Sequence, residues 1–127
     1  MDRHQIIKNF ILVTPTFSSC WKDYINYWEQ EDPGISNDIL CYVNYFVENF
    51  SDLTIEQRKA TLEIVENGLT YGDSSVKDAL ATCFLEALIT AIDLKKIDFN
   101  TINLLGNKST EYCRAWNDFS NEERNID

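Results

Sequence analysis

The most constraining feature of this 127-residue chain is the segment 76–92, whose apolar residues cover far more than half of a helix circumference. They are Val76, Ala79, Leu80, Cys83, Phe84, Leu85, Ala87, Leu88, Ile89, Ala91 and Ile92. A helix that is apolar on so many sides needs neighbouring helices on several sides. The segment therefore predicts a central buried helix in which Leu80, Phe84, Leu88 and Ile92 are nearly inaccessible.

Boundary residues divide the N-terminal part of the chain into three helices. Thr14 followed by Pro15 predicts the end of a first helix and the N-cap of a second, which runs to about Gln30. Ser36 is the expected cap of a third helix, which runs to about Phe50. The second helix has one aromatic and apolar stripe, interpreted as core: Phe17, Trp21, Tyr24, Ile25 and Trp28.

The C-terminal part shows similar signals. Thr54 and Gln57 fit a capping box that starts a fourth helix, which Gly68 or Gly72 ends. The buried segment follows as the fifth helix, and a last helix begins near Gly106.

Composition supports an all-α class. With 44% hydrophobic residues, two prolines and four glycines, the chain is too apolar for disorder and too poor in turn formers for a many-stranded sandwich. Short connections imply that helices two and three, and helices four and five, form antiparallel hairpins. We expect one domain over residues 1–127 with six or seven helices, hairpins stacked around the central helix, and a frayed tail at 121–127.

The cysteine pattern gives no sign of a metal site. Cys20, Cys41, Cys83 and Cys113 form no C-x-x-C pair, and His4 is the sole histidine. No nucleophile–base or nucleotide-binding motif occurs, so we expect neither an enzyme nor a cofactor. The chain has no signal-peptide pattern and no long uncharged apolar run, which predicts a cytoplasmic protein with reduced thiols and no membrane contact.

Charge is strongly unbalanced. The net charge is -10, with 21 acidic against 11 basic residues. Residues 23–57 contain no Lys or Arg and eight acids: Asp23, Glu29, Glu31, Asp32, Asp38, Glu48, Asp52 and Glu56. Such a field repels nucleic acid and attracts basic proteins. A solvated acidic surface without a partner is the alternative.

The third helix adds a second observation. Opposite its apolar residues, five side chains share a face within about 80° at helical spacing: Asp38, Tyr42, Tyr45, Asn49 and Asp52. Tyrosines flanked by acids are typical of an interface with a basic partner, and about 21 Å of helix is long enough for one side of it. The alternative is that Tyr42 and Tyr45 pack beneath the first or second helix.

Several short motifs together suggest a family. They are Pro15-x-Phe17 with Trp21, Gly72-Asp73-x-x-Val76, Phe84-Leu85-Glu86-x-Leu88, Leu105 to Ser109, and Trp116-x-x-Phe119. This set resembles small helical bacterial immunity proteins of polymorphic toxin and contact-dependent growth inhibition systems. The segment Asp73-x-x-Val76-Lys77 is also similar to the D-x-x-V-R pattern of HEAT repeats. The resemblance implies a HEAT-like helical fold and a toxin as partner.

The leading hypothesis is an immunity protein that binds a cognate toxin in a 1:1 complex and covers its active site. The toxin would be a basic nuclease such as an RNase, because its phosphate-binding cleft is positive. The predicted contacts are Glu29, Glu31, Asp32, Asp38, Tyr42, Tyr45, Glu48, Asn49 and Asp52. The alternative is an acidic HEAT-like scaffold or nucleic-acid mimic that binds another basic protein.

Overall fold

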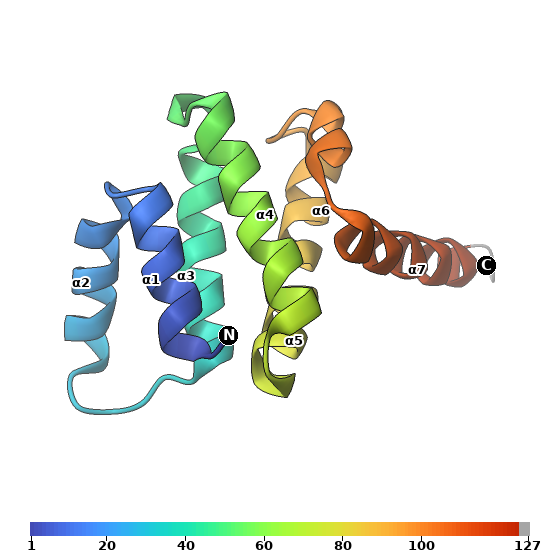
Figure 1. The fold of residues 1–127 in the computed structure, drawn as a ribbon. Helices are drawn as coiled ribbons and strands as arrows, with labels where there is room; N and C mark the ends of the chain where they lie inside the picture. Colours follow the sequence, from blue (N-terminus) through green and yellow to red (C-terminus); the bar gives the residue numbers. More distant parts are fainter. Residues whose placement is uncertain (125–127) are drawn as a thin grey trace.

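Along residues 1–124, seven α-helices, two 3₁₀ segments and one π-helical segment follow one another (Figure 1). The computed structural model describes the backbone of residues 1–124 and the side chains of residues 1–116. The elements are α1 (Arg3–Val13), α2 (Phe17–Trp28), α3 (Ile35–Glu48), η1 (Phe50–Asp52), α4 (Ile55–Tyr71), α5 (Ser74–Ala79), η2 (Leu80–Leu85), α6 (Glu86–Asp93), η3 (Phe99–Leu104) and α7 (Asn107–Arg124).

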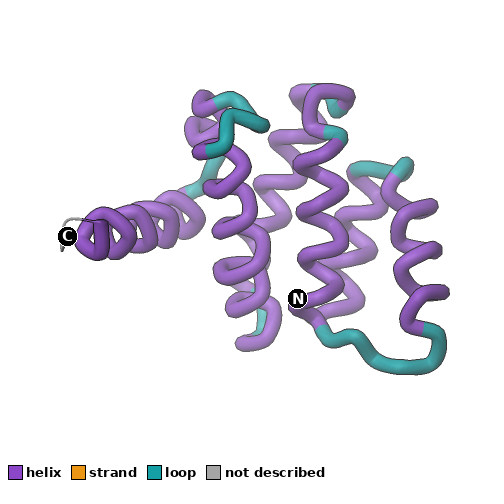
Figure 2. The backbone as a smooth tube through the Cα atoms, turned by 180° about the vertical axis from the view of Figure 1, so that it is seen from behind, coloured by secondary structure: helices purple, strands orange, loops and turns teal. Residues whose placement is uncertain are grey.

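The all-α prediction is confirmed, since helices and loops alone make up residues 1–124 (Figure 2). No helix in this described part is long and apolar enough to cross a membrane. Helix α7 continues to Arg124, past the point where fraying was expected at 121–127, and residues 125–127 lie outside the described chain.

Two of the predicted boundaries are confirmed. Thr54 and Gln57 make the capping box of α4, in which the Thr54 hydroxyl accepts the Gln57 N–H and the Gln57 side chain accepts the Thr54 N–H. Gly72 is the C-cap of α4, and the Asp73 carboxylate caps the next helix by accepting the Val76 N–H. These caps depend on residues close in sequence, which is why the pattern located them.

Two other boundaries differ from the prediction. Thr14 ends α1 as predicted, but it does not cap α2, because its hydroxyl donates to the Phe10 carbonyl and contacts the Tyr42 hydroxyl. Helix α3 starts at Ile35, one residue before Ser36, the residue predicted to be its cap. Gly34 precedes it with φ 85°, a left-handed conformation that favours glycine.

The helices pack in two rows. Helices α1, α4 and α7 are neighbours in one row, and α2, α3 and the continuous α5–η2–α6 helix are neighbours in the other. Figure 1 shows α1 and α4 in front of α3. The hairpin pairs α2–α3 and α4–α5 are in contact, as the short connections predicted.

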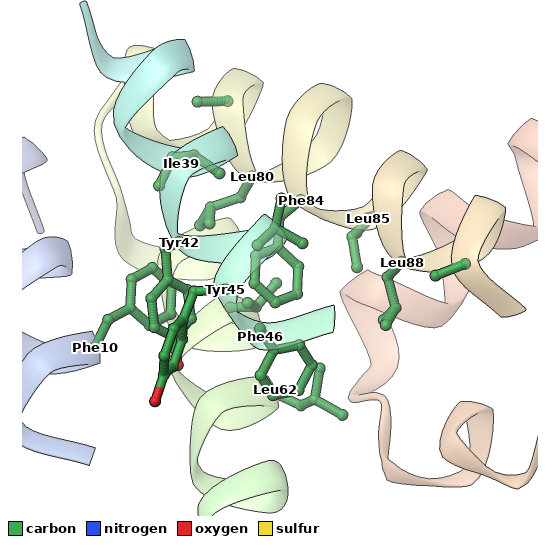
Figure 3. Close-up of a cluster of buried hydrophobic side chains, with 14 of the residues drawn as sticks. Phe10, Ile39, Tyr42, Tyr45, Phe46, Leu62, Leu80, Phe84, Leu85 and Leu88 are labelled. Atoms are coloured by element: carbon green, nitrogen blue, oxygen red, sulfur yellow. The ribbon is translucent and has the colours of Figure 1, made fainter. Parts of the chain in front are cut away.

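The α5–η2–α6 helix is buried at the centre, as predicted. Leu80, Phe84, Leu88 and Ile92 are 0%, 0%, 1% and 8% exposed. Its middle turn, η2, is π-helical, and it contacts α3, α4 and α7. Figure 3 shows its leucine and phenylalanine side chains directed toward the aromatic residues of α3.

Helix α7 is held to α4 by one carboxylate. Glu66 accepts hydrogen bonds from the Lys108 and Ser109 N–H groups, each 2.9 Å long, and one from the Ser109 hydroxyl at 3.0 Å. An added Cβ at Gly106 would lie 2.5 Å from the Glu66 carboxyl group, so the close approach requires glycine. Glu66 therefore caps α7 from a position 42 residues away.

Replacing Glu66 by alanine is expected to lower the free energy of unfolding by about 1–3 kcal/mol near neutral pH, because α7 loses its cap. Burial raises the pKa of Glu66, but the N–H groups of Ser109 and Lys108 outweigh this and leave its pKa below the usual 4.5. The stabilisation that ionised Glu66 gives the fold is therefore complete above about pH 4.5, the usual pKa of the group. It is lost as the pH falls through the lowered pKa of Glu66. Urea unfolding at about pH 7 and pH 3 measures the difference.

Glu63→Ala is the matched control, since Glu63 is exposed on the same helix. A Glu66→Ala protein as stable as the Glu63→Ala protein at neutral pH would contradict the capping role.

Candidate interaction surface

From the sequence, the partner contacts were predicted along one stripe of α3, but most of that stripe is buried in the fold. Asp38, Tyr42 and Tyr45 are only 2%, 0% and 8% exposed. The prediction that these three side chains face a partner is wrong. The alternative, that the tyrosines pack beneath the first or second helix, is confirmed by their aromatic contacts with α1 and α2.

Tyr42 is a core residue with a satisfied hydroxyl. Its ring stacks on Phe10 of α1 with centroids 3.9 Å apart and meets Phe17 of α2 edge-on at 4.8 Å (Figure 3). The hydroxyl oxygens of Thr14 and Thr61 each lie 3.1 Å from the Tyr42 hydroxyl. Burial raises the pKa of Tyr42. The ring thus fills the space between α1, α2 and α3, and its polar end needs no solvent.

Asp38 belongs to an internal polar network. Its carboxylate accepts a 2.6 Å hydrogen bond from the Tyr24 hydroxyl and forms an ion pair with Arg3, which also pairs with Asp32 at 2.8 Å. The pKa of Arg3 is raised, chiefly by its hydrogen bond to Asp38. Burial and then Asp38 raise the pKa of Tyr24, while the Gly34 N–H and then Arg3 lower that of Asp32. This network joins α1, α2 and α3.

The burial of these side chains follows from the position of α3. Helix α3 lies between α2 and the α5–η2–α6 helix in one row, and α1 covers it from the other row. Viewed down the helix axis, the buried residues of α3 cover an arc of about 160°, with Tyr45 at one edge and Val43 at the other, at 100° per residue. A helix at the edge of a domain buries a narrower stripe of about 100°. The sequence pattern reveals an apolar stripe but not how many helices cover its edges.

The remaining predicted contacts form two groups at opposite ends of α3. One group is Glu29, Glu31 and Asp32, all exposed in the α2–α3 loop, and the other is Glu48, Asn49 and Asp52 at the α3 C-terminus. In the second group Glu48 and Asp52 are exposed, while the half-buried Asn49 amide donates to the Tyr45 carbonyl. The 14-residue α3 separates the groups by about 21 Å.

Between these groups lies a solvent-facing row of side chains that the sequence analysis missed. We call Asn37, Leu40, Asn44 and Glu48 the α3 outer face. It is flanked by two grooves, one of about 440 Å³ against α2 and one of about 410 Å³ against the α5–η2–α6 helix. Leu40 is the apolar member of this face and is 37% exposed. The helical spacing of the polar residues Asn37, Asn44 and Glu48 could have located this face from the sequence.

The described residues hold no metal-binding constellation. Among them, no group of three or more His, Cys, Asp or Glu side chains could hold a metal ion. The four cysteines carry free thiols.

Comparison with known proteins gave one result. Residues 7–121 match the sequence profile of the family described as domain of unknown function DUF7674. No curated protein and no solved structure matched the chain. The match covers most of the chain, and the protein therefore belongs to the DUF7674 family.

Proposed function

We propose that this domain is a non-catalytic immunity protein that binds a basic bacterial toxin of the nuclease class and blocks its active site. The supporting observation is the arrangement of carboxylates around α3. Glu29, Glu31 and Asp32 are exposed at one end, and Glu48 and Asp52 at the other. A segment without Lys or Arg carries all five. Arg3 of α1 pairs with Asp32, so the negative field around α3 comes chiefly from Glu29, Glu31, Glu48 and Asp52.

The α3 outer face supplies the contact area between the two groups. Leu40 offers apolar surface, and Asn37 and Asn44 offer donors and acceptors. A row about 17 Å long, with grooves on both sides, matches one side of an interface of standard size. Charges at the rim and a less charged centre are typical of protein interfaces.

The proposal predicts that a nuclease domain is encoded next to this protein's gene, and co-expression with that domain tests it. The domain is expected to restore growth and to co-purify with the toxin in a 1:1 complex. Growth inhibition that persists despite full expression of the folded domain would contradict the proposal. Rescue by a domain that does not co-purify would contradict the binding mechanism.

Charge reversal locates the surface. The triple variant Glu31→Lys/Glu48→Lys/Asp52→Lys is expected to lower the association rate with the toxin at least tenfold and to lose protection at low expression, because these acids steer the basic partner. The control is Glu63→Lys/Asp78→Lys/Asp93→Lys, which changes the net charge equally at three exposed acids of α4 and the α5–η2–α6 helix, outside the acidic segment. Stopped-flow mixing measures both rates. Equal loss in the two variants would show that only the net charge matters.

Ionic strength gives a separate test of the steering. The association rate is expected to fall about tenfold between about 0.01 and 0.15 M salt, because the Debye length shrinks from about 30 Å to 8 Å. The dissociation rate is expected to change much less. An association rate that is flat over this range would show that the acids are solvated surface without a role in encounter.

A further inference from the structure

Two hydrogen-bonded side-chain pairs fix the register of the antiparallel helices α2 and α3. The Thr16 hydroxyl is bonded to the Tyr45 hydroxyl at one end, and the Tyr24 hydroxyl donates to Asp38 at the other. Cys20 lies midway between the two α2 residues, four positions from each. Cys41 lies between the two α3 residues, three positions from Asp38 and four from Tyr45. The register therefore places the two cysteines opposite each other.

The surroundings of the two thiols agree with this placement. Cys20 and Cys41 line the same groove between α2 and α3, together with Tyr24, Asn44 and Tyr45. Cys20 is exposed and Cys41 is half-buried, and both are free thiols. Small reagents can thus reach Cys20 more easily than Cys41.

We propose that Cys20 and Cys41 are a redox modification site, at which exchange with a small oxidised disulfide such as oxidised glutathione forms a reversible disulfide between α2 and α3. The observation that carries the proposal is the juxtaposition of the two thiols between two fixed side-chain pairs. It is independent of the toxin partner.

The exchange proceeds in two balanced steps. The Cys20 thiolate attacks one sulfur of oxidised glutathione, so that a mixed disulfide forms and one glutathione thiolate leaves. The Cys41 thiolate then attacks the Cys20 sulfur and releases the second glutathione thiolate. The leaving thiolates take up the two protons lost by Cys20 and Cys41. The protein dithiol loses two electrons, and oxidised glutathione gains them.

The exposed position of Cys20 makes it the first nucleophile. Burial raises the pKa of the Cys41 thiol to about 11, with smaller contributions from the charges of Cys20 and Asp38. Cys41 is therefore mostly protonated in neutral solution and acts second, in an intramolecular step that needs little thiolate.

The bond would stabilise a helix that buries few of its side chains. Phe17 is the one fully buried residue of α2, whereas Trp21, Tyr24 and Trp28 are only half-buried. The disulfide would close the loop of residues 20–41, which contains the α2–α3 connection. Closing a loop of this size removes unfolded-state entropy and is expected to raise the melting temperature by about 10 °C.

The test uses full-length protein carrying Cys83→Ser and Cys113→Ser, so that Cys20 and Cys41 are the only thiols. After exposure to excess oxidised glutathione and trapping of free thiols, mass spectrometry is expected to show a monomer that has lost two hydrogens. Peptide mapping is expected to find residue 20 linked to residue 41. The oxidised protein is expected to melt about 10 °C above the reduced protein.

Two single variants in the same background decide the outcome. Adding Cys41→Ser is expected to leave a stable glutathione adduct on Cys20, and adding the exposed Cys20→Ser is expected to leave Cys41 nearly unmodified. The proposal is overturned if the parent also keeps its glutathione adduct on Cys20. It is equally overturned if the cross-link joins two molecules, or if the linked monomer melts at the same temperature as the reduced one.

Discussion

The double variant Tyr42→Ala/Tyr45→Ala is expected to lose about 5 kcal/mol or more of unfolding free energy, enough to unfold a domain of ordinary stability. Tyr42 is fully buried against Phe10 and Phe17, and its removal would leave a large cavity. It would also leave the Thr14 and Thr61 hydroxyls without their shared partner. Far-ultraviolet circular dichroism and urea unfolding measure the loss.

The chain offers a matched control for this substitution. Tyr27 and Tyr71 are 81% and 74% exposed, and Tyr27→Ala/Tyr71→Ala is expected to change the unfolding free energy by less than about 1 kcal/mol. Should the Tyr42→Ala/Tyr45→Ala protein instead remain helical and stable, the packing described for α3 would be wrong. If that stable protein also failed to bind the toxin, the tyrosines would belong to the interface.

Local signals predicted the helices well. The capping box of Thr54 and Gln57 lies within four residues, and the apolar run at 76–92 is too broad for any position except the centre. Each of these features consists of residues that are close together in the sequence. They can therefore be interpreted without knowing which distant segments pack against them. The number of helices and the central position of residues 76–92 followed from such features.

The orientation of α3 could not be predicted in the same way. An apolar stripe gives the direction of the core, but the width of the buried arc depends on which helices cover the two sides. Asp38 illustrates the difficulty, since its partners Arg3 and Tyr24 lie 35 and 14 positions away on two other helices. A charged residue beside two tyrosines has the same local pattern at an interface and in an internal network.

The aromatic stripe of α2 was predicted to be buried, but it is partly exposed, which is the reverse of the error made for α3. Phe17 is buried as predicted, but Trp21, Tyr24 and Trp28 are only half-buried and Ile25 is 43% exposed. Helix α2 lies at the end of its row, where α1 and α3 are its neighbours. An amphipathic helix at such an end keeps part of its apolar face in solvent, and its sequence cannot show that the row stops there.

Phe84→Ala is expected to lower the unfolding free energy by about 3–5 kcal/mol, the usual cost of removing a fully buried aromatic ring. Phe84 is inaccessible to solvent at the π-helical turn, where its ring lies 5.8 Å from Phe46 of α3 and 6.1 Å from Phe10 of α1, centroid to centroid (Figure 3). Three helices meet there, so none can move in to fill the cavity without leaving its other contacts. Urea unfolding followed by circular dichroism measures the change.

Phe99→Ala makes the same chemical change at a side chain that is 70% exposed, and it is expected to cost less than about 0.5 kcal/mol. The difference in unfolding free energy between the two variants therefore measures the effect of burial, because both variants lose the same phenyl ring. Equal stability of the two proteins would contradict the placement of the α5–η2–α6 helix at the centre of the fold. A large loss at Phe84 alone would support that placement, because a side chain contributes this much only where helices on several sides exclude water from it.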